Sequence, residues 1–180
     1  LIFTRQVPRL DHLRPHRTRH VATRAAKAIL FALTLLTLGG SSVFVYAAAI
    51  GEELDGLSPL TVSLLFSANA LASIPSARWT GRRGPAGIWF LMTALCALTI
   101  ALSRSGLLFG AAMIGWGFVF FMGVPAAFTL LAARSNFPEE RAGDAQAVMA
   151  LGRVFGPLLG GALYAAGARF QAAPGPWACC

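Results

Sequence analysis

Residues 105–133 read SGLLFGAAMIGWGFVFFMGVPAAFTLLAA, a run of 29 residues without Asp, Glu, Lys or Arg. A helix needs roughly 20 apolar residues to cross the hydrocarbon layer of a bilayer. Further uncharged runs occupy 28–51, 56–77, 84–103 and 154–168, separated by short charged islands. Only 12% of the residues are charged, against about 25% in soluble domains. The pattern predicts an all-α integral membrane protein with about five transmembrane helices.

The charged islands and the turn residues set the expected boundaries. Ser58 followed by Pro59 predicts a helix start, since serine is a good N-cap and proline is tolerated in the first turn. Residues 1–27 form a basic segment, and residues 169–180 form a Pro/Gly-rich tail. We expect the helices at about 28–50, 58–77, 86–103, 106–133 and 145–168.

The positive charge is concentrated ahead of the first helix. The net charge is +8, and residues 1–27 hold seven of the 15 Lys and Arg residues. Such a segment could bind nucleic acid, but before a membrane helix a basic flank more commonly faces the cytoplasm. Alternate sides of the five spans carry 12 and 2 Lys and Arg residues. The positive-inside rule predicts a cytoplasmic amino terminus and a carboxyl terminus outside, and the expected location is the plasma (inner) membrane.

The fifth expected helix carries a regular glycine pattern. Gly152, Gly156 and Gly160 recur every fourth residue and therefore share one helix face. A face without side chains lets a neighbouring backbone approach closely, and ordinary small-residue packing accounts for the pattern by itself. The complete pattern is Gly143, Gly152, Gly156, Pro157, Gly160 and Gly161.

The glycine spacing resembles the antiporter motif of the major facilitator superfamily, which belongs to the fifth helix of that family and has a related form in the eleventh. The island ARWTGRRG at 77–84 resembles the family's basic loop between the second and third helices of each half. Gly81, Arg82 and Arg83 match the tail of that loop, whereas Arg78 stands where the family has an acidic residue. A plain cytoplasmic anchor is the alternative function of this island.

Two longer stretches extend the resemblance to 28–168. Residues 44–85 are similar to the seventh and eighth helices of proton-coupled multidrug efflux members, including the Bcr/CflA-like group, and residues 125–152 to the tenth and eleventh. The resemblance implies a carboxyl-terminal half that moves a drug or metabolite by alternating access and proton antiport. A family half has six helices, so five imply an incomplete six-helix half-bundle. The order of the helices also permits an amino-terminal half.

Arg153 is the only ionisable residue well inside an expected span. A charge at the bilayer centre costs about 2.5–3.5 kcal/mol on insertion scales, and such residues often mark transport pathways. Arg153 could line a cavity, or its long side chain could reach back to the cytoplasmic interface. Glu139, Glu140 and Asp144 are its expected partners there.

Other polar and aromatic residues are candidates for a solute pathway. Asn69 is the one amide deep in a span, where it would contact solute or form an interhelical hydrogen bond. Aromatic side chains could line a drug pocket, or face lipid and neighbouring helices. These are Tyr46, Trp116, Phe118, Phe120 and Phe121.

The residues predict no enzyme, no cofactor and no metal centre. His12, His16 and His20 are spaced four apart, but they lie in an Arg-rich segment that makes metal binding a minor alternative. The expected partners are the lipid bilayer, a small solute, possible coupling protons, and a missing transporter half or second copy, with no nucleic acid. Since no carboxylate lies inside a span, a proton carrier would belong to the missing half. A truncated, non-transporting membrane fragment or helix-packing scaffold is the alternative function.

Overall fold

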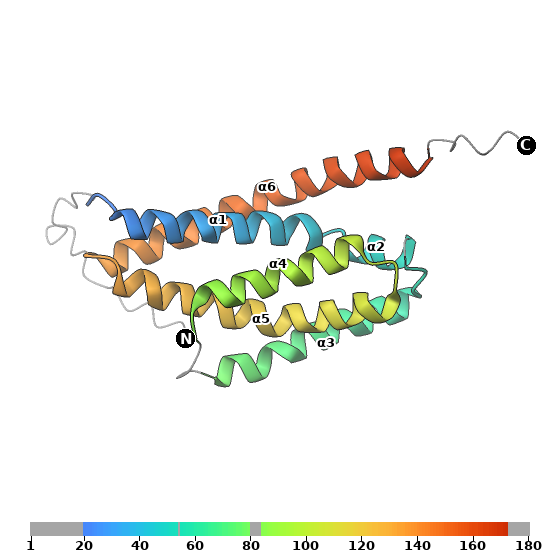
Figure 1. Cartoon of the computed structure of the whole chain (residues 1–180), viewed down its shortest axis with the longest axis horizontal. Coiled ribbons are helices and arrows are strands. Elements are labelled where there is room, and N and C mark those ends of the chain that lie inside the picture. The colour runs from blue at the N-terminus through green and yellow to red at the C-terminus, as the bar shows by residue number, and fades with distance from the viewer. Residues whose placement is uncertain (1–19, 54, 80–83, 173–180) are drawn as a thin grey trace, which may run out of the picture.

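The computed structural model describes residues 20–53, 55–79 and 84–172, with side chains up to residue 166. These residues form six helices and no strand, as Figure 1 shows. The helices are α1 (Arg24–Phe44), α2 (Ala47–Glu53), α3 (Pro59–Arg78), α4 (Ala86–Leu102), α5 (Gly106–Ala133) and α6 (Pro138–Ala172).

The predicted all-α class is confirmed. Four helical stretches are long and apolar enough to cross a membrane: 24–53, 59–78, 106–133 and 138–166. Helix α4 is a shorter apolar helix of 17 residues. The described part of the chain is therefore suited to a membrane-embedded protein with several crossings.

Helices α3, α4 and α5 lie close to the predicted boundaries. The Ser58 hydroxyl accepts a hydrogen bond from the Thr61 backbone N–H at 3.2 Å, and Pro59 occupies the first turn of α3. The predicted serine cap is therefore present. Helix α5 coincides with the predicted range 106–133 and continues through Pro125 without interruption.

The first predicted helix, 28–50, is two helices in the structure. Helix α1 starts at Arg24, where the Thr23 hydroxyl caps the Ala26 N–H, and it ends at Phe44. At Tyr46 the backbone N–H bonds the Val43 carbonyl at 3.1 Å, a tighter spacing than the helical i−4 partner. Helix α2 then begins at Ala47. No glycine, proline or charge marks this break in the sequence.

The last predicted helix, 145–168, starts seven residues earlier, at Pro138. The island before it is helical because proline suits a first turn, and Glu139 and Glu140 place negative charge at the positive end of the helix dipole. Its charges therefore lie on the first turns of α6, and not in a loop as the sequence suggested.

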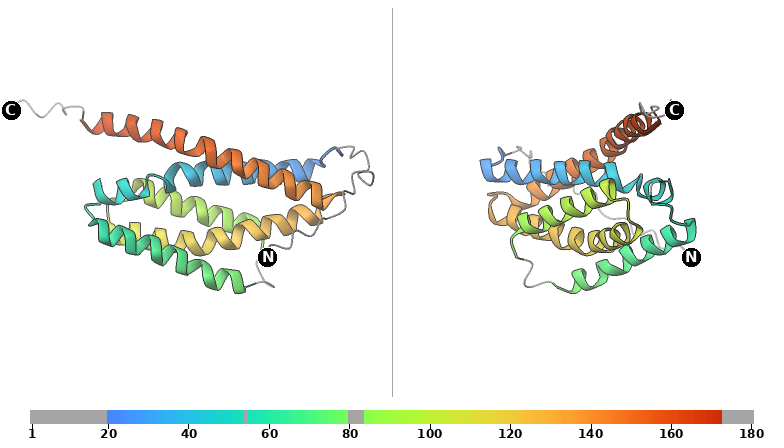
Figure 2. Two further views of the ribbon diagram at one scale, coloured as in Figure 1. Left: turned by 180° about the vertical axis from the view of Figure 1, so that it is seen from behind. Right: turned by 45° about the vertical axis from the view of Figure 1, so that its right-hand side comes forward.

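The helices form two closely packed groups joined by α5. Helix α1 lies along α6, while α5 contacts both α3 and α4 (Figures 1 and 2). Two apolar clusters fill opposite ends of the bundle. One includes Leu33, Leu131 and Met149, and the other includes Ile50, Phe109 and Met113. Between these clusters lies the middle of the bundle, where several buried residues are polar.

The outer surface is apolar. Many leucines are more than half exposed, including Leu71 on α3, Leu91 and Leu95 on α4, and Leu158 and Leu163 on α6. Soluble monomers rarely expose contiguous apolar patches of more than a few hundred Å². Lipid tails are the natural surroundings for this surface, which agrees with the length and composition of the helices.

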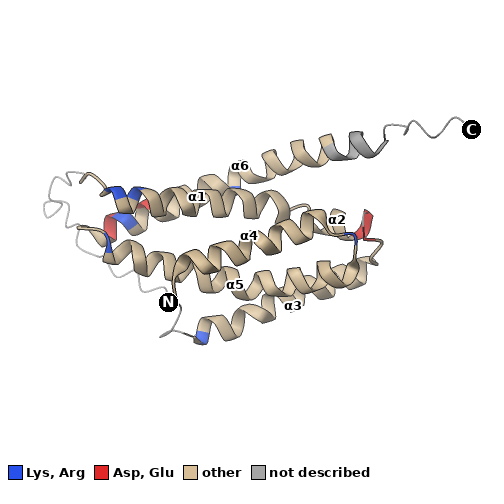
Figure 3. Ribbon diagram, viewed as in Figure 1, with Lys and Arg blue, Asp and Glu red and all other residues tan. Residues whose placement is uncertain are grey.

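Apart from Arg153, the described charges gather at the two ends of the bundle (Figure 3). One end carries Arg24 and Lys27 at the start of α1, Arg78 at the end of α3, Arg134 at the end of α5 and Arg141 in the first turns of α6. The opposite end carries Glu52, Glu53 and Asp55, with Arg104 as its described basic residue. We call these the basic end and the acidic end.

Candidate functional site

The glycine pattern of α6 forms a seam with α1. A Cβ atom added at Gly156 would lie 2.6 Å from the Leu38 carbonyl oxygen, and one at Gly160 would overlap the Ser42 carbonyl. The Ser42 hydroxyl donates a hydrogen bond to the Gly156 carbonyl at 2.8 Å across the seam. Only glycine permits this approach of two helix backbones.

The remaining members of the pattern have different surroundings. Gly152 lies against Thr37, and Gly161 lies under the hydroxyl of Tyr46. The same hydroxyl donates a hydrogen bond to the Pro157 carbonyl at 3.2 Å. Gly143 has no neighbour within 4 Å of an added Cβ, so it takes no part in the seam.

A second close approach joins α3 to α5. The Asn69 side-chain amide donates a hydrogen bond to the Met113 carbonyl at 2.6 Å. One turn further along α5, Gly117 lies directly against the Asn69 backbone carbonyl. The buried Asn69 therefore forms the interhelical hydrogen bond that its sequence position suggested.

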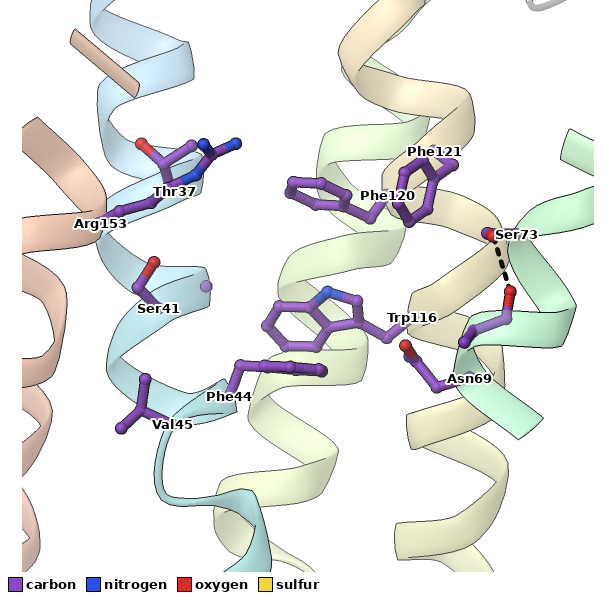
Figure 4. A pocket seen from close by; sticks show the side chains of 12 residues that line it. Thr37, Ser41, Phe44, Val45, Asn69, Ser73, Trp116, Phe120, Phe121 and Arg153 are labelled. Atoms are coloured by element: carbon purple, nitrogen blue, oxygen red, sulfur yellow. Dashed lines mark hydrogen bonds between the residues drawn. The ribbon is translucent and has the colours of Figure 1, made fainter. Parts of the chain in front are cut away.

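A cleft of about 390 Å³ opens between these two helix pairs (Figure 4). Helices α1, α3, α5 and α6 all contribute to its wall. Small-molecule sites commonly have volumes of about 300–1,000 Å³ and combine apolar walls with a few polar groups. The lining residues are Thr37, Gly40, Ser41, Phe44, Val45, Asn69, Ala70, Ser73, Trp116, Phe120, Phe121 and Arg153.

The cleft has an aromatic wall and a polar wall. Phe44, Trp116 and Phe120 supply large apolar surfaces, and Figure 4 shows their rings directed into the space. Across from Phe120, Arg153 extends from α6 beside Thr37 of α1 (Figure 4). This arrangement can hold an aromatic group and a polar group of one small solute at the same time.

Two of the three predicted carboxylate partners of Arg153, Glu140 and Asp144, contact Arg141 instead. Asp144 contacts Arg141 at 2.5 Å, and Glu140 contacts the same guanidinium at 3.1 Å. Arg141 is 5% exposed and also donates a hydrogen bond to the His20 carbonyl at 2.8 Å. Among the described residues, Arg153 has no ion-pair partner, and its guanidinium faces the cleft.

His20 completes a cluster at the basic end. Its ring lies 3.2 Å from a Glu140 carboxylate oxygen and stacks on Phe137 with ring centroids 3.6 Å apart. The cluster ties the chain before α1 to the start of α6. In the described residues, no three His, Cys, Asp or Glu side chains are grouped closely enough to hold a metal ion.

The structure brings together five of the seven residues predicted for the solute pathway. Asn69, Trp116, Phe120, Phe121 and Arg153 line one cleft. Tyr46 lies outside it, because it is held by the Pro157 carbonyl and stacks on Tyr164 with centroids 5.7 Å apart.

Phe118, the seventh of these residues, also lies outside the cleft and packs edge-on against Trp89. Arg78 ends α3 at the basic end, while Gly81, Arg82 and Arg83 lie outside the described residues. Sequence reasoning missed Thr37, Ser41 and Phe44, which carry no signal of their own and line the cleft because the glycine seam holds α1 beside α6.

No family model, curated protein or solved structure matches this chain.

Proposed function

We propose that the chain is part of a secondary transporter of the major facilitator type, which moves a small solute through the cleft by alternating access. The observation that carries this proposal is the cleft itself. It combines Asn69, Arg153 and an aromatic wall inside a bundle whose outer surface is apolar. Polar and ionisable residues inside membrane bundles are costly and commonly line transport pathways.

The proposed setting is the plasma (inner) membrane, with the basic end in the cytoplasm. Efflux of a drug or metabolite, with protons as coupling ions, is the role that the family resemblance implies. A second half or a second copy would cover the cleft on the side where the described helices leave it open. A second half, unlike a second copy, would also supply the proton-carrying residue, since no Asp or Glu lies in the five long apolar runs of this chain.

The alternative is a non-transporting membrane fragment or scaffold. The glycine seam favours the scaffold, because close helix packing alone accounts for Gly152, Gly156 and Gly160. A packing role, however, gives no reason for an arginine in the middle of the bundle that has no ion-pair partner among the described residues. Transport therefore explains more of the described residues than packing does.

Filling the cleft tests the proposal. Ala70 lines the cleft and is exposed to it, while its neighbour Leu71 is 64% exposed on the outer surface. The full chain is expressed in efflux-deficient bacteria, and accumulation of anionic, neutral and cationic fluorescent aromatic compounds is measured. We expect expression of the chain to lower the accumulation of at least one compound. Ala70→Trp should abolish this lowering, and Leu71→Trp should leave it unchanged.

The paired variants separate transport from scaffolding. Both add an indole to α3 at adjacent positions, so general damage to the helix affects them equally. Unchanged accumulation of every compound upon expression, with protein present in the membrane, would remove the transport proposal and leave the scaffold.

A further inference from the structure

The charge of the cleft comes from one side chain. Among its lining residues, Arg153 is the only ionisable one, and no carboxylate accompanies it. The described carboxylates lie at the two ends of the bundle, where Glu140 and Asp144 already contact Arg141. The cleft is therefore a positively charged space inside an apolar bundle.

The depth of Arg153 places it away from both membrane surfaces. Its neighbour Gly152 lies against Thr37, so Arg153 is level with the middle of α1. Thr37 follows Lys27 by ten residues, which is about 15 Å of helix. That distance is about half of a 30 Å hydrocarbon layer. Figure 4 shows the guanidinium beside Thr37, opposite Phe120.

An uncompensated guanidinium at this depth favours an anion strongly. The attraction between opposite charges grows as the local dielectric constant falls, and the same field repels a cation. Carboxylate and phosphate groups also match the fork of donors on arginine. The Ser41 hydroxyl on the same wall offers a further donor, whereas the Thr37 hydroxyl already donates to the Leu33 carbonyl at 2.9 Å.

We infer that the cleft selects an amphipathic anion whose carboxylate, sulfonate or phosphate group contacts Arg153 and whose aromatic part packs on Trp116 and Phe120. This inference rests on the proposed function, because it names the class of solute for the same cleft. The volume of about 390 Å³ suits a solute of one or two rings. Hydrophobic cations, which many drugs are, should be excluded.

The test uses three nitroaromatic probes of similar size: 4-nitrobenzoate, 4-nitrobenzamide and 4-nitrobenzyltrimethylammonium. Nitroaromatic rings quench tryptophan fluorescence, and Trp116 lies on the cleft wall. The full chain is placed in phosphatidylcholine nanodiscs, and the saturable part of the quenching gives a Kd for each probe. We expect nitrobenzoate to bind about tenfold or more tightly than the other two, since hydrogen bonds to charged groups are worth about 1.5–3 kcal/mol.

Variants assign the effect to Arg153. Arg153→Gln should raise the Kd of nitrobenzoate about tenfold and leave that of nitrobenzamide unchanged, while Arg153→Lys should recover most of the affinity. Arg104→Gln removes the same charge from an exposed position at the acidic end and serves as the matched control. The inference would be overturned if nitrobenzoate and nitrobenzamide bound with equal Kd, or if Arg153→Gln left the Kd of nitrobenzoate unchanged.

The headgroup of an anionic lipid is the other source of such an anion, since its phosphate, unlike that of zwitterionic phosphatidylcholine, has no ammonium group beside it. Repeating the titrations in discs containing phosphatidylglycerol distinguishes lipid from free solute. The change in Kd that Arg104→Gln shows between the two kinds of disc gives the effect of the surface potential. If lipid phosphate occupies the guanidinium, the wild-type Kd for nitrobenzoate rises to that of Arg153→Gln in these discs, which contradicts a free solute. If the ratio of the nitrobenzoate Kd of Arg153→Gln to that of wild type is unchanged in these discs, a free solute is supported as the source of the anion.

The two proposals fail in different ways. If all three probes bind with equal Kd and Ala70→Trp abolishes their binding, the anion inference is wrong but the cleft remains a site for a solute. Arg153-dependent nitrobenzoate binding without any transport would remove the proposed function and leave an anion site. Absence of saturable nitrobenzoate binding would overturn the inference directly.

Discussion

Asn69 serves both packing and the cleft. Its amide nitrogen bonds the Met113 carbonyl, which is also the natural acceptor of a hydrogen bond within α5. The bond therefore adds a partner to an acceptor that is already satisfied, and its loss leaves no orphaned group on α5. Its cost should be that of one interhelical hydrogen bond in a membrane protein, which averages about 0.6 kcal/mol and reaches about 1.7 kcal/mol.

Asn69→Ala should lower the free energy of unfolding by about 1 kcal/mol. Ser73→Ala is the control, because the Ser73 hydroxyl lines the same cleft but donates only to the Ala70 carbonyl of its own helix, at 2.6 Å. Unfolding in mixed detergent micelles, followed by circular dichroism, measures both variants. Equal effects of the two substitutions would contradict a structural role for the Asn69 bond.

At the scale of elements, the seam between α1 and α6 is the close helix contact that the glycine periodicity of the sequence indicated. The glycine spacing predicted a bare helix face, and the structure places α1 against it. The same spacing gave no information about the partner helix or its depth. For that reason Thr37 and Arg153, which come from distant parts of the chain, could not be assigned to one cleft beforehand.

Two glycines of α6 should respond to alanine in opposite directions. Gly156→Ala places a methyl group 2.6 Å from the Leu38 carbonyl, and overpacking of this kind costs about 1–3 kcal/mol. Gly143→Ala meets open space, so the higher helix propensity of alanine should stabilise α6 by up to about 1 kcal/mol. Thermal unfolding of the full chain in detergent measures both, and destabilisation by Gly143→Ala equal to that by Gly156→Ala would contradict the seam.

Helix boundaries were predictable where charge or capping chemistry marked them. The uncharged run ending at Ala133 defined α5, and the Ser58 cap defined the start of α3. The break after Phe44 was not predictable, because Val45 and Tyr46 suit a helix and only tertiary contacts of Tyr46 with α6 distinguish them. The charges after Pro138 were assigned to a loop, although they lie in the first turns of α6, where the carboxylates of Glu139 and Glu140 complement the helix dipole.

On the scale of the whole molecule, the bundle buries several polar residues and exposes many leucines. Buried Thr37, Asn69 and Thr93 lie within the helices, whereas Leu91 and Leu158 are exposed. Lys and Arg gather at one end of the bundle (Figure 3). The sequence predicted the second feature, because all the Lys and Arg residues except Arg153 lie beyond the ends of the expected spans.

The asymmetry of 12 against 2 Lys and Arg residues predicts the topology of the whole chain. Alkaline phosphatase fused after residue 180 should be active outside the cytoplasm, and green fluorescent protein at the same position should be dark. A control fusion after residue 136, in the α5–α6 connection, should give fluorescent green fluorescent protein and inactive phosphatase. Cytoplasmic fluorescence from the fusion at residue 180 would contradict the number of crossings.

The seam has a mechanical consequence for the cleft. Helix α1 contributes Thr37, Ser41 and Phe44 to the wall of the cleft, and the same helix meets the glycine face of α6 along Thr37, Leu38 and Ser42. Two helices in backbone contact have little room to slide or roll against each other, because no flexible side chains lie between them. Helices α1 and α6 therefore form one stiff unit. Any opening or narrowing of the cleft must move this unit as a whole against α3 and α5, carrying Arg153 with it.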